Sequence, residues 1–134
     1  MRALSGRILA HALAGQTEPE AVAAAVEGTV RRLHEEVSSL IGPVGLLALV
    51  RRATHLSRRE FPWLDQLEVQ VGHVMALQGL TECVRTQGRE QVAEGATLLL
   101  SHLLELLCNF IGQDLTLRMV RRGWPTLLET SRDE

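Results

Sequence analysis

Apolar residues recur along most of the chain at the three- to four-residue spacing of amphipathic helices. The clearest stripe predicts a long helix over 18–41 and comprises Val22, Val26, Val30, Leu33, Val37, Leu40 and Ile41. A shorter helix precedes it and ends near Gly15. Gly42-Pro43 ends the long helix and opens the next, which should stop near Glu60 because Phe61 is followed by Pro62.

The second half of the chain predicts three more helices. A linking helix over 65–87 is expected to start at a capping box, Asp65 to Glu68, and to end before Gly88. A helix over 90–111 follows, and from 96 to 111 it is apolar nearly all round, which indicates burial on several sides. A short last helix, 113–122, ends at Gly123-Trp124-Pro125. No strand alternation is identified.

The second helix pair repeats the first. Residues 17–52 align without gaps on 87–122, a shift of 70 residues, and eleven of the 36 aligned positions are identical. Ile41-Gly42 meets Ile111-Gly112, and Val50-Arg51-Arg52 meets Val120-Arg121-Arg122. The interpretation is a duplicated helix-kink-helix unit (about 17–64 and 87–128) related by a pseudo-twofold axis. Coincidence between two Ala/Leu/Arg-rich helices is the alternative.

The predicted fold is therefore all-α. One domain, 1–134, forms a bundle of four main helices with short terminal helices. Only 3% of the 134 residues are aromatic, and this composition argues against an all-β fold. The apolar content of 90–111 exceeds what one small bundle needs, which suggests that the chain forms a homodimer.

Charge and cysteine content narrow the setting of the protein. The formal net charge is −2, so no nucleic-acid partner is expected. No segment reaches the ~18 uncharged apolar residues of a membrane span. Cys83 and Cys108 lie in apolar helical runs and are interpreted as buried, reduced thiols. A bacterial-type cytoplasmic protein is the expectation.

Arginine clusters are the main candidate for partner or anion binding. Arg51, His55 and Arg58 share one helix face at spacing i, i+4 and i+7, and Arg52 and Arg59 flank that face. Arg118, Arg121 and Arg122 echo the cluster in the second unit. Guanidinium groups suit an anion or an acidic protein surface. The alternative is that these arginines only favour helix C-termini and balance the acidic helices.

Two further sets of residues are weaker candidates. Trp63 and Trp124 each adjoin a proline and are considered as exposed knobs for a partner, against the alternative that they plug the ends of the bundle. His102 and Glu105 lie at i, i+3 and are weak metal-ligand candidates, in an order opposite to that of di-iron bundles. No cofactor is predicted.

No motif for nucleophilic catalysis or phosphate binding is present in the sequence. The predicted function is a non-catalytic interaction or regulatory module whose partner is a protein, including a second copy of itself. A ligand- or metal-binding bundle with a site between helices is the first alternative, and an enzyme with an unrecognised site is the second. No small-molecule ligand is identified.

Overall fold

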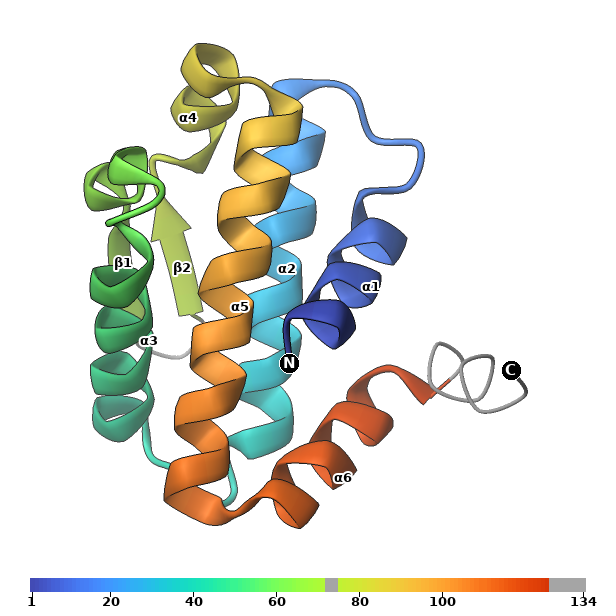
Figure 1. Ribbon diagram of the computed structural model, residues 1–134, viewed down its shortest axis with the longest axis vertical. Helices are drawn as coiled ribbons and strands as arrows, with labels where there is room; N and C mark the ends of the chain where they lie inside the picture. Colours follow the sequence, from blue (N-terminus) through green and yellow to red (C-terminus); the bar gives the residue numbers. More distant parts are fainter. Residues whose placement is uncertain (72–74, 126–134) are drawn as a thin grey trace.

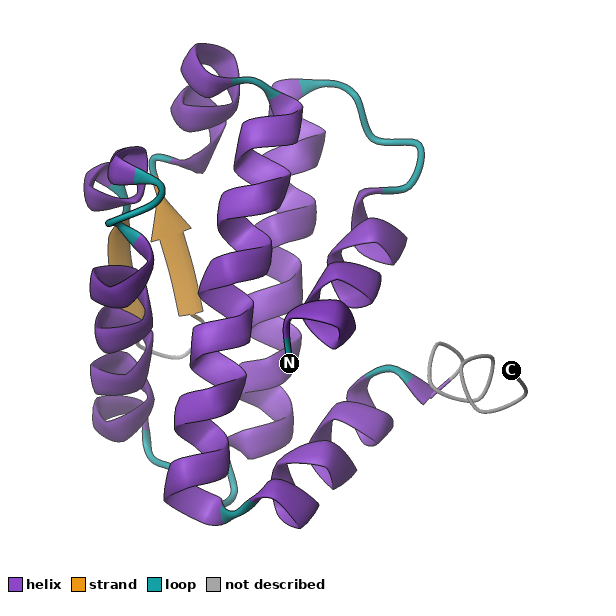
Figure 2. Ribbon diagram, viewed as in Figure 1, coloured by secondary structure: helices purple, strands orange, loops and turns teal. Residues whose placement is uncertain are grey.

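The computed structural model describes residues 1–71 and 75–125. Over this part the chain is mostly helical, as predicted, and one two-stranded sheet interrupts the helices (Figures 1 and 2). In chain order the elements are α1 (Arg2–Leu13), α2 (Pro19–Val37), α3 (Pro43–Ser57), the 3-10 helix η1 (Pro62–Gln66), β1 (Glu68–Val71), β2 (Met75–Gln78), α4 (Leu80–Gln87), α5 (Arg89–Ile111) and α6 (Gln113–Gly123).

Helix α5 lies at the centre of the molecule. It packs against α1, α2, α3, α4 and α6. Helices α2 and α5 run side by side in the same direction, while α3 and α6 return in the opposite direction (Figure 1). Helix α3 and the hairpin lie on one side of α5, and α1 and α6 lie on the other. Most of the apolar surface of 96–111 is therefore covered within the chain itself, and Phe110 near its end stays exposed.

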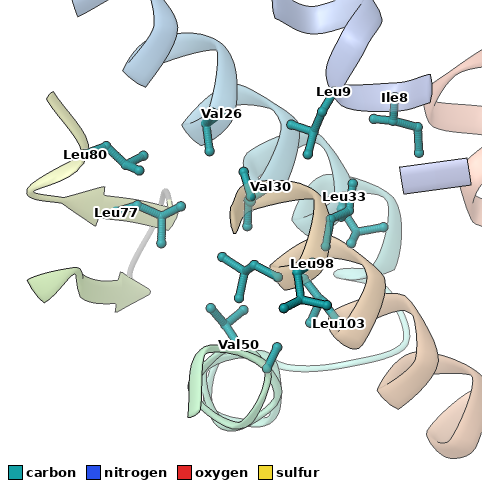
Figure 3. Close-up of a cluster of buried hydrophobic side chains, with 14 of the residues drawn as sticks. Ile8, Leu9, Val26, Val30, Leu33, Val50, Leu77, Leu80, Leu98 and Leu103 are labelled. Carbon is teal, nitrogen blue, oxygen red and sulfur yellow. The ribbon is translucent and has the colours of Figure 1, made fainter. Parts of the chain in front are cut away.

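Side chains from six elements meet in one apolar core. Leu98 and Leu103 of α5 face Val26, Val30 and Leu33 of α2 (Figure 3). The remaining contributions come from α1, α3, β2 and α4, in the residues Ile8, Leu9, Val50, Leu77 and Leu80. Leu103 and Leu33 are almost completely shielded from solvent, as expected of the stripes that predicted these helices.

Single glycines separate consecutive helices in the second half of the chain. Gly88 (φ 93°) lies between α4 and α5, and Gly112 (φ 94°) lies between α5 and α6. A residue with a Cβ is strained at such positive φ values, so glycine permits the sharp change of direction at both positions. Both helix ends were predicted from the sequence.

The linking helix predicted over 65–87 is wrong for most of its length. Residues 62–66 form η1, and β1 and β2 pair as an antiparallel hairpin in which Val69 faces Leu77. Within the described residues of this stretch, α-helix is found at 80–87, as α4. The apolar residues fit a helical period, but 67–71 also alternate strictly between apolar and polar, which is the strand period. The expectation that the chain has no strand is likewise wrong.

The hairpin is fastened to α2 by one carboxylate. The backbone N–H of Leu77 donates to Glu27 Oε2 at 2.8 Å, and Arg31 Nη2 donates to Glu27 Oε1, also at 2.8 Å. Leu77 is buried and Val69 packs against the core from the partner strand. An isolated two-stranded hairpin is marginal in water, so this anchoring and the buried leucine hold the sheet in place.

Trp63 of η1 is accommodated by a glycine of the central helix. A Cβ at Gly95 would lie 2.4 Å from Cζ2 of the Trp63 ring, far inside van der Waals contact. The indole is also in edge-on contact with Phe61, with the ring centroids 6.3 Å apart. Gly95 thus lets the segment between α3 and β1 approach α5 closely.

Helix α5 is, within residues 1–71 and 75–125, the single helix that is long and apolar enough to cross a bilayer. Half of its most apolar stretch is buried inside the protein. This burial is what the central core helix of the fold requires.

Replacing Gly95 by alanine tests the contact with Trp63. The added methyl group overlaps the indole, and overpacking of this kind costs about 1–3 kcal/mol, which outweighs the helix propensity of alanine. We expect Gly95→Ala to lower the free energy of unfolding in urea. Gly28→Ala, on α2 with open space around its Cβ, is the matched control and should be neutral or stabilising. Equal stability of the two variants would contradict the proposed fit.

Removing the carboxylate of Glu27 tests how the hairpin is held. Glu27→Ala leaves the N–H of Leu77 without its acceptor, which costs about 1–3 kcal/mol. We expect this loss in the free energy of unfolding measured with urea, whereas Glu35→Ala, at an exposed position of the same helix, should change it by less than about 0.5 kcal/mol. If both variants unfold alike, Glu27 does not anchor the sheet.

Candidate anion-binding groove

A groove of about 500 Å³ runs between α3 and the hairpin. Helix α3 and the residue that caps it supply one wall through Arg51, Thr54, His55 and Arg58. The facing wall comes from η1, β1 and the residue between them, through Asp65, Leu67, Glu68, Val69 and Gln70. The volume lies within the range of ligand-binding sites in proteins.

The basic wall follows from helical spacing. Arg51, His55 and Arg58 were predicted to share one face, and all three line the groove. Each of them is exposed to solvent. The hydroxyl of Thr54, on the same wall, donates back to the carbonyl of Val50 at 2.8 Å, so its proton is engaged within the helix. Two guanidinium groups and an imidazole are therefore the donors that this wall offers.

Charges in the groove are only partly balanced by ion pairs. Arg58 Nη1 lies 3.2 Å from Asp65 Oδ1, which joins the two walls at one end. Among residues 1–71 and 75–125, Arg51, His55 and Glu68 form no ion pair. Arg58 pairs with Asp65. Among the described residues, the unpaired groups of the groove are therefore the guanidinium of Arg51 and the imidazole of His55 on one wall, and the carboxylate of Glu68 on the other.

The other predicted basic residues do not join this groove. Arg52 and Arg59 are exposed but are not part of its lining. Arg118, Arg121 and Arg122 lie on α6, across α5 from α3 (Figure 1). Arg122 Nε lies 3.4 Å from Glu36 Oε2 of α2, as the alternative of charge balance with the acidic helices would have it. The two arginine clusters therefore do not form one surface.

Both tryptophans are buried, so the knobs considered from the sequence are wrong. Trp63 is 5% exposed and Trp124 is 6% exposed. Both side chains belong to the core cluster, as the alternative of a buried position requires. Apolar side chains that do project into solvent are instead Leu40, Val44 and Phe110.

His102 and Glu105 lie near each other but gain no further ligand. His102 Nδ1 is 4.0 Å from Glu105 Oε2, within one helix face of α5. Over the described ranges 1–71 and 75–125, no group of three His, Cys, Asp or Glu side chains converges as a metal site would require. The geometry there gives a pair of neighbours on one helix and no third donor.

The two cysteines carry free thiols. Cys83 is buried and Cys108 is half-buried. Burial raises the pKa of the Cys83 thiol above its ordinary value, and the negative charge of neighbouring Glu82 raises it further. A raised pKa keeps the thiol protonated and weakly nucleophilic, so Cys83 is suited to packing in the core.

The hairpin wall of the groove was missed from the sequence. Glu68, Val69 and Gln70 were assigned to a helix, which would have turned them to different faces. The signal that could have found them is the alternation of apolar and polar residues over 67–71. Asp65 was read as a helix cap and instead pairs with Arg58.

Comparisons with protein-family models, with curated proteins and with solved structures find no significant match to this chain.

Proposed function

We propose that the protein is a non-catalytic interaction module that binds an anionic segment of a partner protein in the groove between α3 and β1. The observation that carries this proposal is the position of Arg51 and His55, which line the groove without an ion-pair partner in the described part of the chain. A guanidinium group that has no carboxylate partner within its own protein is well suited to bind a carboxylate of another molecule.

The surroundings of the groove favour a protein segment over a free small anion. The cavity is open and lies between a helix and a strand, and its lining mixes charged groups with the side chains of Leu67 and Val69. Small-molecule sites enclose most of their ligand, whereas an open groove with apolar and charged positions suits a chain segment. A regulatory role would follow from the capture of such a segment.

Self-association is a second candidate function, and a different surface favours it. Leu40, Val44 and Phe110 are 46%, 82% and 65% exposed. They belong to the α2–α3 connection, the start of α3 and the end of α5, which lie at the same end of the molecule (Figure 1). Apolar side chains gathered at one end are typical of an interface, and a homodimer would bury the same patch of both copies.

We also propose that the chain contains two copies of a helix-kink-helix unit. Helices α2 and α5 begin 70 residues apart, at Pro19 and Arg89, and α3 and α6 do so at Pro43 and Gln113. Each short helix also packs on the long helix of the other unit, α3 on α5 and α6 on α2. These correspondences support a four-helix arrangement of two helix-kink-helix units, with the hairpin as an insertion after the first.

We further propose that the protein is a single cytoplasmic domain that binds no nucleic acid. A single domain, a cytoplasmic location and the absence of a nucleic-acid partner agree with the composition, the net charge and the two free thiols. The ligand- or metal-binding bundle and the enzyme are kept as alternatives, and the groove is the place on the described surface where a ligand would be sought first.

Charge reversal in the groove tests the leading proposal. The probe is a fluorescein-labelled six-residue peptide of alternating threonine and glutamate, titrated with the full-length protein and followed by anisotropy. Loss of one charge-assisted contact weakens binding about tenfold, and reversal repels the peptide, so Arg51→Glu should weaken it at least that much. Arg118→Glu, at an exposed arginine of α6, is the control and should bind like the wild type. Equal affinities of the two variants would contradict the proposal.

Sedimentation equilibrium tests self-association. The wild-type protein should sediment at micromolar concentration as a dimer of the 14.8 kDa chain. Phe110→Asp introduces a charge into the apolar end and should give a monomer, while Asn109→Asp, at the exposed neighbouring residue, should leave the dimer intact. If the wild-type protein is a monomer throughout the micromolar range, the proposed homodimer is wrong.

A further inference from the structure

The two edges of the hairpin have different surroundings. The outer edge of β2 faces α2, where the N–H of Leu77 donates to Glu27 Oε2 at 2.8 Å. A strand edge with free N–H and C=O groups is a template for pairing with another strand. Glu27, held by Arg31, occupies the edge of β2 in place of such a strand.

This hydrogen bond also shows in which direction the backbone groups of β1 point. In an antiparallel ladder the N–H and C=O of one residue point to the same side, and directly opposed residues share their pattern. Because the N–H of Leu77 points away from β1, its partner Val69 must point its own N–H and C=O away from β2. The hydrogen-bonded pairs of the hairpin are the ones on either side, which include Gln70 with Ala76.

The outward groups of Val69 lie at the candidate groove. Val69 is part of its lining, and no hydrogen bond to a described residue engages these groups. Figure 3 shows β2 between α2 and β1, and α3 packs beside β1. A strand added there would lie about 4.8 Å from β1 and alongside α3.

We infer that the groove binds an extended acidic segment of a partner protein, which adds to β1 as a third strand while its carboxylates face Arg51 and His55. This inference rests on the proposed function and specifies how the segment is held. Main-chain hydrogen bonds to β1 would provide affinity, and the basic face of α3 would select acidic side chains, as in other cases of strand addition.

The charges of both walls set where the acidic side chains lie. Arg51 and His55 of α3 and Arg58 at its C-terminal cap line one wall of the groove, and Asp65 and Glu68 line the opposite wall. Asp65 is balanced by Arg58, whereas Glu68 at the start of β1 repels a carboxylate. Since α3 and β1 run in opposite directions, Arg51 lies toward the end of the groove away from Glu68. The acidic residues of the segment belong at that end.

Amide hydrogen exchange with the same alternating threonine–glutamate peptide, acetylated and amidated, tests strand addition. The full-length protein is labelled with ¹⁵N, and exchange is measured by NMR with and without saturating peptide. The N–H of Val69 should exchange at least tenfold more slowly with the peptide bound. The N–H of Gln70, already within the hairpin ladder, is the internal control and should change little. A threonine–lysine peptide should leave both rates unchanged.

The outcomes separate strand addition from the proposed function. If the acidic peptide binds in an Arg51-dependent manner and Val69 exchanges as fast as before, strand addition is wrong and the anion-binding groove stands. If the acidic peptide does not bind at about 1 mM, both are wrong. If the lysine peptide slows Val69 equally, the edge of β1 pairs with any strand and the selection by Arg51 and His55 is wrong.

Discussion

The hydrogen bond from the Leu77 N–H to Glu27 is the interaction on which the account of the surface depends. It joins β2 to α2 and, with the register of the two strands, shows which backbone groups of the hairpin point outward. A carboxylate that accepts from a backbone N–H forms a charge-assisted bond, which is stronger than a neutral one. With the edge of β2 next to α2, the remaining edge of the sheet is that of β1, which lies at the groove beside α3.

The central helix α5 is the element against which the other helices pack. Its leucines are buried against neighbours on several sides, and Gly95 leaves room for Trp63 where the chain leaves α3 for the sheet. A side chain at Gly95 would push η1 outward, and Asp65 would move with it. The opposite wall of the groove therefore depends on a position at which the central helix has no side chain.

The sequence predicted the parts of the fold that follow one period over a long distance. The stripes of α2 and α5 and the breaks at Gly42, Gly88 and Gly112 are visible in the residue order alone. The hairpin was missed because its apolar residues satisfy two periods at once. Whether 67–71 becomes helix or strand is decided by tertiary contacts such as the one with Glu27, which residue order does not reveal.

The sequence predicted one wall of the candidate site and missed the other, because only the first depends on local helix geometry. The basic face of Arg51, His55 and Arg58 depends only on the geometry of one helix, and it lines the groove as expected. The wall formed by β1 depends on a fold that brings the hairpin beside α3. The tryptophans, chosen because they are rare, lie in the core, since a large apolar ring is worth more there than on the surface.

Hydrogen exchange of the hairpin in the ligand-free protein tests the central claim most directly, because it reports which strand edge is open. We predict slow exchange at Leu77, whose N–H donates to Glu27, and fast exchange at Val69. Replacing Glu27 by alanine should make Leu77 exchange faster while Val69 stays as it is. Strong protection of Val69 in the free protein would show that its edge is covered and would contradict the account.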